Sequence, residues 1–316
     1  MRHSTEHSVL LGTKNPVKSK WRGYYELMRL HKSVMGNTLM FWPCAWGLTM
    51  AAYSYGLSLR DLTTELLLFA IGSTLLHSAA CVLNDICDID FDKKVERCKT
   101  RPLPAGIVTV GEAWILLVLL VVPATAMLLL TNRTAMLCGL LGVFPFHALY
   151  PLMKRWTYWP QAWLGLAMNW GYPVAWITIT GDIKADVVWV FFFGTVCWTI
   201  VYDTIYACQD REDDVHAGVK STAVLFGDYV RPILIAFTVA FLGLMTYAGM
   251  CNGQSFGYYF ISCGGSAIHF AWQFLTWHVE VPEDGGAKFQ SNGVIGCLIW
   301  LGMLLDYFLD VRSAAM

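Results

Sequence analysis

The sequence predicts an all-helical bundle that crosses a membrane several times. Of its 316 residues, 56% are hydrophobic and only 14% are charged, whereas soluble domains carry about 25% charged residues. The chain holds 14 Trp, 14 Tyr and 17 Phe, and aromatic side chains collect where a membrane meets water. Its apolar runs are long enough to cross the hydrocarbon core and lack the two-residue alternation of a membrane β-barrel.

Nine apolar segments are candidate spans, which predicts about nine helices in a single domain over 1–316. We expect the first span to be broken by Pro43 and Gly47, and the fifth by Pro173. Such breaks are tolerated where neighbouring helices satisfy the backbone. The segments lie near 35–53, 62–83, 110–130, 134–151, 160–180, 186–206, 231–250, 256–279 and 292–310.

The distribution of basic residues predicts how the bundle is oriented. The amino-terminal segment and the loops after even-numbered spans contain 17 of the 22 Lys and Arg. The positive-inside rule therefore places these parts, including 1–30, in the cytosol or in the equivalent compartment of an organelle. The first residues lack the apolar core of a secretory signal and match a mitochondrial transit peptide poorly. We expect the endoplasmic reticulum or another endomembrane rather than the mitochondrial inner membrane.

Composition also excludes several classes of function. The net charge of −1 gives no sign of a nucleic-acid partner. The ten Cys residues include no C-x-x-C pair, so a zinc site or a disulfide framework is not expected.

Two acidic clusters follow the second and sixth spans, in what we expect to be loops on the same side of the membrane. If these segments stay helical, Asn84, Asp88 and Asp92 share one face, and Asp210 and Asp214 share another. Like charges at this spacing repel, so a divalent cation is expected to compensate them. Magnesium is typically held by one or two carboxylates together with substrate phosphates. The paired clusters therefore predict two magnesium ions that clamp a diphosphate.

Basic residues lie where phosphate oxygens would need them, although the positive-inside bias alone would also place Lys and Arg there. Arginine binds phosphate as a planar fork, and lysine acts as a point charge. The candidates are Lys93, Lys94, Arg97, Arg101, Lys154, Arg155 and Lys220.

These motifs resemble those of the UbiA family of intramembrane aromatic prenyltransferases. The family's first motif, N-D-x-x-D-x-x-x-D, is matched at every fixed position by Asn84, Asp85, Asp88 and Asp92. Its second motif, D-x-x-x-D, is matched by Asp210 and Asp214. The resemblance covers nearly the whole chain and is closest to the subgroup that acts on 4-hydroxybenzoate and to its fungal relatives. Further similar stretches are 101–106, with Thr100 where the family usually has Asn, 150–161, 202–210 and 220–223.

The resemblance implies a reaction in which magnesium neutralises a leaving diphosphate, an allylic cation forms, and an electron-rich aromatic carbon attacks it. The implied metal ligands are Asn84, Asp88, Asp92, Asp210 and Asp214. The residues expected to hold the diphosphate are Arg29, Arg97, Arg101 and Lys220, and those expected to act in catalysis are Asp203, Lys154 and Arg155. Asp203 is a candidate for orienting a basic residue or the acceptor, and a packing carboxylate at a helix end is an equal alternative.

One departure bears on the acceptor. The family often reads R-x-x-K-P-x-G near the first span, which lines the acceptor side of its cavity, whereas this chain has Ser33 in place of Pro. We therefore expect farnesyl diphosphate as donor and a phenolic polyketide as acceptor, as in fungal meroterpenoid biosynthesis. A 4-hydroxybenzoate polyprenyltransferase of ubiquinone biosynthesis and a UbiA-type terpene cyclase remain alternatives. A transporter is disfavoured because its buried carboxylates would lie at mid-span.

Overall fold

The computed structural model describes residues 19–32, 36–94 and 98–314, and within these ranges every regular element is a helix. The all-helical fold class is therefore confirmed. Ser33 and Arg97, which the sequence analysis singled out, lie outside the described residues. The α-helices are α1 (Lys20–Leu27), α2 (Asn37–Tyr55), α3 (Leu59–Asp92), α4 (Val110–Met127), α5 (Arg133–Leu141), α6 (Ala148–Trp156), α7 (Pro160–Asn169), α8 (Gly171–Thr180), α9 (Ala185–Ala207), α10 (Arg211–Ala217), α11 (Thr222–Phe226), α12 (Val230–Asn252), α13 (Gly265–Thr276) and α14 (Pro282–Ala314).

Short 3-10 and π turns extend several of these helices. The 3-10 turns are η1 (Leu30–Lys32), η2 (Leu128–Leu130), η4 (Cys208–Asp210) and η5 (Gly227–Tyr229), and the π turns are η3 (Gly142–His147) and η6 (Tyr258–Gly264).

Six helical stretches among the described residues are long and apolar enough to cross a membrane: Leu59–Asp92, Val110–Leu130, Arg133–Trp156, Ala185–Asp210, Thr222–Asn252 and Pro282–Asp310. The predicted multispanning architecture is thus supported. The other three predicted spans also fall on helices, namely α2, the pair α7–α8, and η6 with α13.

The helix breaks differ from those expected. Helix α2 is continuous, with Pro43 inside it, and Gly47 serves close packing, since a Cβ there would lie 2.5 Å from the Tyr172 carbonyl oxygen. The fifth predicted span breaks between α7 and α8 at Trp170 and not at Pro173. Pro173 lies in the first turn of α8, where a backbone N–H has no partner within the helix.

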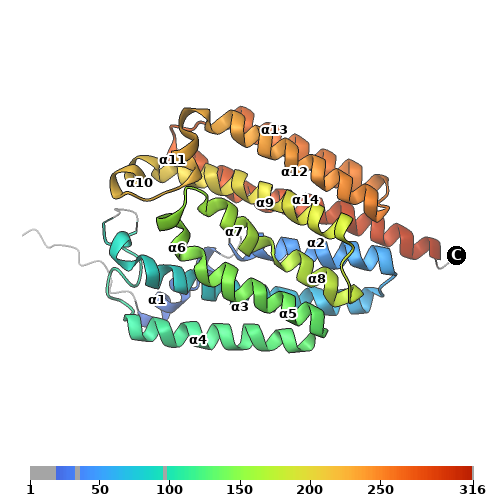
Figure 1. The fold of residues 1–316 in the computed structure, drawn as a ribbon, viewed down its shortest axis with the longest axis horizontal. Helices are drawn as coiled ribbons and strands as arrows, with labels where there is room; N and C mark the ends of the chain where they lie inside the picture. Colours follow the sequence, from blue (N-terminus) through green and yellow to red (C-terminus); the bar gives the residue numbers. More distant parts are fainter. Residues whose placement is uncertain (1–18, 33–35, 95–97, 315–316) are drawn as a thin grey trace, which may run out of the picture.

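The long helices run along the same axis (Figure 1). Helices α3 and α4 lie on one side, α12 and α13 on the other, with α2, α9 and α14 between them, and α1, α10 and α11 gather at one end (Figure 1). The closest helix pairs are α9 with α12, α2 with α8, and α3 with α4.

Aromatic packing and buried hydrogen bonds fix the central helices. Trp46 of α2 and Trp198 of α9 pack with ring centroids 5.3 Å apart, and the Trp198 indole donates to Asn292 of α14 at 2.9 Å. The Asn169 amide of α7 donates to the Thr199 hydroxyl of α9 at 2.8 Å. Hydrogen bonds of this kind join helices inside a membrane. They hold α9, which carries Asp203, in a fixed position against α2, α7 and α14.

Helix α3 is much longer than a span requires. Its 34 residues extend over about 51 Å, compared with a hydrocarbon core of about 30 Å. Ser58 caps its first turn by accepting a hydrogen bond from the Asp61 backbone N–H. The surplus length carries the last turns of α3, with the first acidic motif, to one end of the bundle.

Candidate active site

The two acidic motifs face a single cavity of about 700 Å³. Asn84 and Asp88 reach it from the last turns of α3, and Asp210 and Asp214 reach it from η4 and α10. The expectation that both motifs lie in loops is wrong: α3 stays helical through Asp92, and the second motif lies in the short helical segments η4 and α10. Further lining residues are Arg29, His77, Asp85, Asp92, Arg101, His147, Tyr150, Lys154, Arg155, Met168, Tyr202, Asp203, Tyr206 and Phe289.

Arginines hold the carboxylates of α3 together. Asp85 is fully buried, and its Oδ1 lies 2.7 Å from Arg29 Nη2 and 3.5 Å from Arg101 Nη1. Arg101 Nη1 also lies 2.8 Å from Asp92 Oδ2. The pKa of Arg101 is raised: burial would lower it, but the Asp85 and Asp92 carboxylates together more than offset that effect. Arg101 was expected to bind the diphosphate and Asp92 the metal. In this structure the two side chains pair with each other.

The carboxyl end of α6 supplies further positive charge. Arg155 Nη2 lies 3.9 Å from Asp88 Oδ1, donates to the Cys87 carbonyl oxygen at 2.7 Å, and sits over the Phe91 ring. Lys154 lines the cavity beside it. Lys220 is placed elsewhere: its Nζ donates to the Trp156 carbonyl oxygen at 3.4 Å, and it is not among the lining residues.

The donor set of the cavity fits magnesium. All the ligand candidates offer oxygen atoms, which magnesium prefers, and the buried Asn84 Oδ1 and Asp85 Oδ2 have no hydrogen-bond partner. Over residues 19–32, 36–94 and 98–314, no three His, Cys, Asp or Glu side chains form a group that could hold an ion. The oxygen ligands are therefore divided between two walls, which suits an ion that completes its coordination with phosphate oxygens.

A second, basic chamber of about 410 Å³ adjoins the main cavity. The two share Arg29, His77, Arg101 and Asp203, and His31 and Lys32 of η1 line only the basic chamber. Burial lowers the pKa of His31, and the positive charges of Lys32 and Arg29 lower it further. Arg29, Lys32 and Arg101 line this chamber together with the carboxylates of Glu26 and Asp203, so an anionic group such as a carboxylate would fit on its basic side.

Several cavity residues were missed by the sequence analysis because they lie within apolar spans. His77, His147, Tyr150 and Tyr202 all line the main cavity. A signal for His77 was present, since it precedes Asn84 by two helical turns and so shares its face. Gly36 packs directly against it, since the His77 ring would have to shift to make room for a Cβ at that position.

The comparison with known families agrees with this geometry. Residues 40–300 match the UbiA prenyltransferase family. The chain belongs to this family. It is therefore an enzyme, an aromatic prenyltransferase, and the resemblance seen in its motifs is confirmed.

Individual relatives extend the similarity over most of the chain. The chain is 42% identical over 290 residues to the UbiA prenyltransferase claS of Ampulloclitocybe clavipes, covering 92% of each chain. It is 40% identical over 288 residues to the mitochondrial 4-hydroxybenzoate polyprenyltransferase of Arabidopsis thaliana, covering 90% of this chain and 68% of the relative.

Solved structures share the fold. The apo UbiA homologue from Aeropyrum pernix K1 superposes with a TM-score of 0.71 at 24% identity, covering 85% of this chain and 97% of the homologue. A UbiA homologue from Archaeoglobus fulgidus, solved bound to DMAPP and Mg²⁺, gives a TM-score of 0.65 at 17% identity, covering 91% and 99% of the two chains. The helical arrangement is thus that of the family.

The paired arginines yield a prediction about stability. Asp85→Ala should remove the carboxylate that pairs with the partly buried Arg29, while Arg101 keeps Asp92, and should lower the free energy of unfolding by about 3 kcal/mol. Thermal unfolding of the purified protein in detergent measures this. Asp90→Ala is the matched control on the same helix, because the Asp90 side chain is 84% exposed and, among the described residues, its ion pair is with the exposed Lys93 at 3.7 Å. Equal unfolding temperatures for the two variants would show that the buried pairs do not stabilise the fold.

Proposed function

We propose that this enzyme transfers a prenyl group from a prenyl diphosphate to an aromatic acid by magnesium-assisted ionisation. The observation that carries the proposal is the convergence of two acidic walls on one cavity with basic side chains beside them. The Archaeoglobus fulgidus homologue bound to DMAPP and Mg²⁺ supports the same pairing of metal and diphosphate here.

In this proposal Asn84 and Asp88 hold magnesium from one wall, and Asp210 and Asp214 hold it from the other. Bound magnesium would neutralise charge that develops on the leaving diphosphate. Lys154 and Arg155 lie beside Asp88 and bind the diphosphate oxygens. They keep the diphosphate in place while the allylic C–O bond breaks, and they stabilise the charge that builds up on its oxygens.

Aromatic side chains are placed to stabilise and shield the allylic cation. The Phe289 ring lies 4.7 Å from the Tyr206 ring and 5.5 Å from the Tyr202 ring, and all three line the cavity. Aromatic faces attract cations, and an apolar wall keeps water away from the reactive carbon. Asp203 lines both the main cavity and the basic chamber, so we assign it the role of orienting the acceptor.

We further propose that the donor is farnesyl diphosphate and the acceptor a phenolic polyketide acid of meroterpenoid biosynthesis. Similarity to the fungal claS over 92% of both chains supports this choice, and the basic chamber has room for the carboxylate of such an acid. The enzyme would then reside in the endoplasmic reticulum or another endomembrane, with its cavity open on the cytosolic side.

The alternative is 4-hydroxybenzoate polyprenyltransferase activity, which the 40% identity to the Arabidopsis thaliana enzyme favours. The basic chamber would bind the carboxylate of that acceptor equally well. A terpene cyclase is supported less, because the basic chamber would then have no acceptor to bind.

The metal role is tested by chelation and by substitution. Activity in membranes should disappear with a chelator and return with added magnesium. Asp88→Ala, Asp210→Ala and Asp214→Ala should each lower turnover by at least ~100-fold, since each removes a group that stabilises developing charge. Asp90→Ala, which changes an exposed carboxylate outside the cavity, should retain normal turnover. Near-normal turnover in all three cavity variants would refute the proposed metal site.

The acceptor is tested by competition. Membranes receive 4-hydroxybenzoate and an orsellinic-acid-type phenol at equal concentrations, with farnesyl and longer donors supplied in separate reactions. The products should come mainly from the orsellinic-type phenol and farnesyl diphosphate. A site that binds the second hydroxyl of this phenol would leave its own polar groups unpaired with 4-hydroxybenzoate, which lacks that hydroxyl. Preference for 4-hydroxybenzoate with a long donor would instead assign the enzyme to ubiquinone biosynthesis.

A further inference from the structure

The orientation of the His147 ring is set by a hydrogen bond to the backbone. His147 ends the π turn η3, and its side chain is buried. Its Nδ1 lies 3.0 Å from the Gly142 carbonyl oxygen. A carbonyl oxygen can only accept, so Nδ1 carries the hydrogen of this bond. In the neutral ring, which burial favours, the other nitrogen, Nε2, then presents a lone pair.

Aromatic side chains hold the π turn in place. The Trp163 indole of α7 donates to the Phe146 carbonyl oxygen at 2.8 Å, and the Trp170 indole donates to the Cys138 carbonyl oxygen at 2.8 Å. The Phe146 and Trp170 rings pack with centroids 4.7 Å apart. Single π turns within α-helices occur frequently at functional sites. The backbone that positions His147 is therefore fixed on both sides of the turn.

The Nε2 atom of His147 lacks a partner that its surroundings should supply. It is buried and has no hydrogen-bond partner among the residues that the structure describes. Leaving a buried polar atom unpaired costs free energy, and most such atoms in proteins are paired. His147 lines the main cavity, so a bound substrate can supply the missing partner.

The partner has to donate a hydrogen bond, which narrows its chemistry. Of the groups on the proposed substrates, the diphosphate and the ionised carboxylate can only accept, and the isoprene chain can do neither. A phenolic hydroxyl can donate. It is also the group that makes the acceptor ring rich in electrons.

We propose that His147 Nε2 accepts a hydrogen bond from a phenolic hydroxyl of the acceptor and thereby selects acceptors that carry one. The inference rests on the proposed function, because it assumes an aromatic acceptor in the main cavity. It adds the residue that recognises the hydroxyl, whereas the basic chamber takes the carboxylate.

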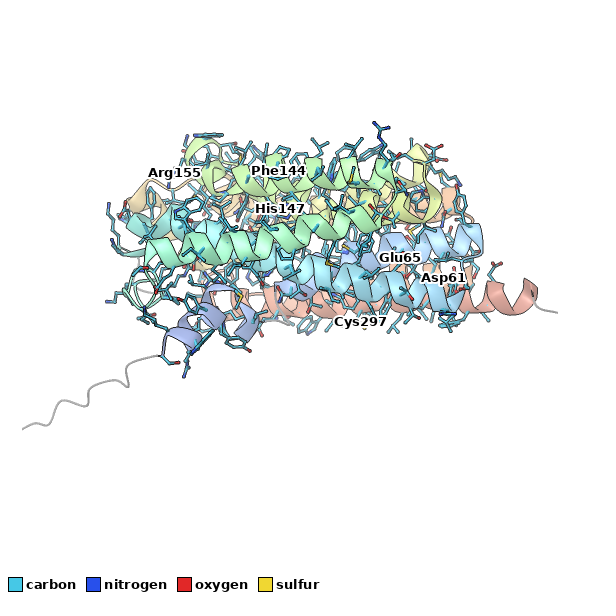
Figure 2. The ribbon with its side chains drawn as sticks, turned by 90° about the horizontal axis from the view of Figure 1, so that it is seen from below. Asp61, Glu65, Phe144, His147, Arg155 and Cys297 are labelled. Carbon is cyan, nitrogen blue, oxygen red and sulfur yellow. The ribbon has the colours of Figure 1, made fainter. Side chains whose placement is uncertain are left out.

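The positions along η3 and α6 agree with this role. His147, Tyr150 and Lys154 all line the main cavity, and their spacing of three and four residues places them on one helical face. The helix rises about 10 Å from His147 to Lys154, the residue proposed to bind the diphosphate. Figure 2 shows Arg155, His147 and Glu65 in that order along the long axis of the bundle. His147 therefore lies deeper in the bundle than the basic side chains at the diphosphate.

An acceptor fits within this interval. A hydroxyl that donates to Nε2 lies about 2.7 Å from its acceptor atom, and a ring carbon ready to react lies about 3–3.5 Å from the allylic carbon. A single aromatic ring thus bridges the distance between His147 and the reacting end of the donor.

The test compares phenols with their methyl ethers. Orsellinic acid and 4-hydroxybenzoate are each supplied as the phenol and as the fully O-methylated acid, with farnesyl or longer diphosphates. The ether keeps an electron-rich ring but cannot donate. The unaltered enzyme should prefer the phenol in kcat/KM by at least ~100-fold, because the ether leaves Nε2 unpaired. In His147→Val, which removes Nε2 and leaves room for the methyl group, the preference should fall to within ~5-fold.

Two further variants assign the effect to the acceptor atom. His147→Gln should keep the preference for the phenol, because its amide oxygen can still accept. His269→Val is the matched control: His269 lies in α13, outside the main cavity, and its Nε2 lies 3.2 Å from the Ser291 hydroxyl. It should leave the preference unchanged. If His147→Val fails to accumulate, His147→Met makes the same test with an unbranched apolar side chain.

The outcomes separate this inference from the proposed function. Absence of transfer to every acceptor by the unaltered enzyme would refute the proposed function. An active enzyme that uses phenol and ether equally well would refute the hydroxyl contact alone. So would a preference of ~100-fold that persists in His147→Val or His147→Met.

Discussion

Carboxylates from two distant segments must share one cavity at the end of a membrane bundle, and their mutual repulsion is the constraint on which the site depends. Asp85 is fully buried, and Arg29 and Arg101 bind it from two other parts of the chain. Breaking such a buried pair leaves an uncompensated charge, so these contacts fix where the chain before α2 and the segment after α3 lie. The same arginines line both the main cavity and the basic chamber. The ion pairs that stabilise the end of α3 therefore also shape these two cavities.

The oxygen atoms that the protein could offer to magnesium come from two walls of the cavity. Asn84 and Asp88 lie on one wall and Asp210 and Asp214 on the other, and no group of three metal-binding side chains forms among the described residues. This division suits magnesium, which keeps phosphate oxygens in its coordination shell. An aromatic cluster of Tyr202, Tyr206 and Phe289 lines the same cavity, in which the proposed reaction would form an allylic cation.

The sequence predicted what depends on local pattern. Hydropathy located nine helical segments, and the spacing of Asn84, Asp88, Asp210 and Asp214 indicated two acidic faces. It did not show that α3 continues through Asp92, because the end of a helix depends on tertiary contacts such as the Arg101–Asp92 pair. Nor did it show that Lys220 bonds to the Trp156 carbonyl or that His77 and His147 line the cavity. Those facts follow from packing between segments far apart in sequence.

In the proposed mechanism the two acidic walls and the donor diphosphate bind magnesium jointly. Titration of the detergent-solubilised enzyme with Mn²⁺, followed by electron paramagnetic resonance, tests it with and without an unreactive farnesyl thiodiphosphate. No group of three metal-binding side chains forms among the described residues, so phosphate oxygens of the analogue should complete the coordination of the metal. Mn²⁺ should therefore bind at least ~10-fold more tightly when the analogue is present, because the metal and the analogue stabilise each other's binding. Asp88→Ala should abolish that gain. Equally tight Mn²⁺ binding without the analogue would contradict joint binding of the metal by protein and diphosphate.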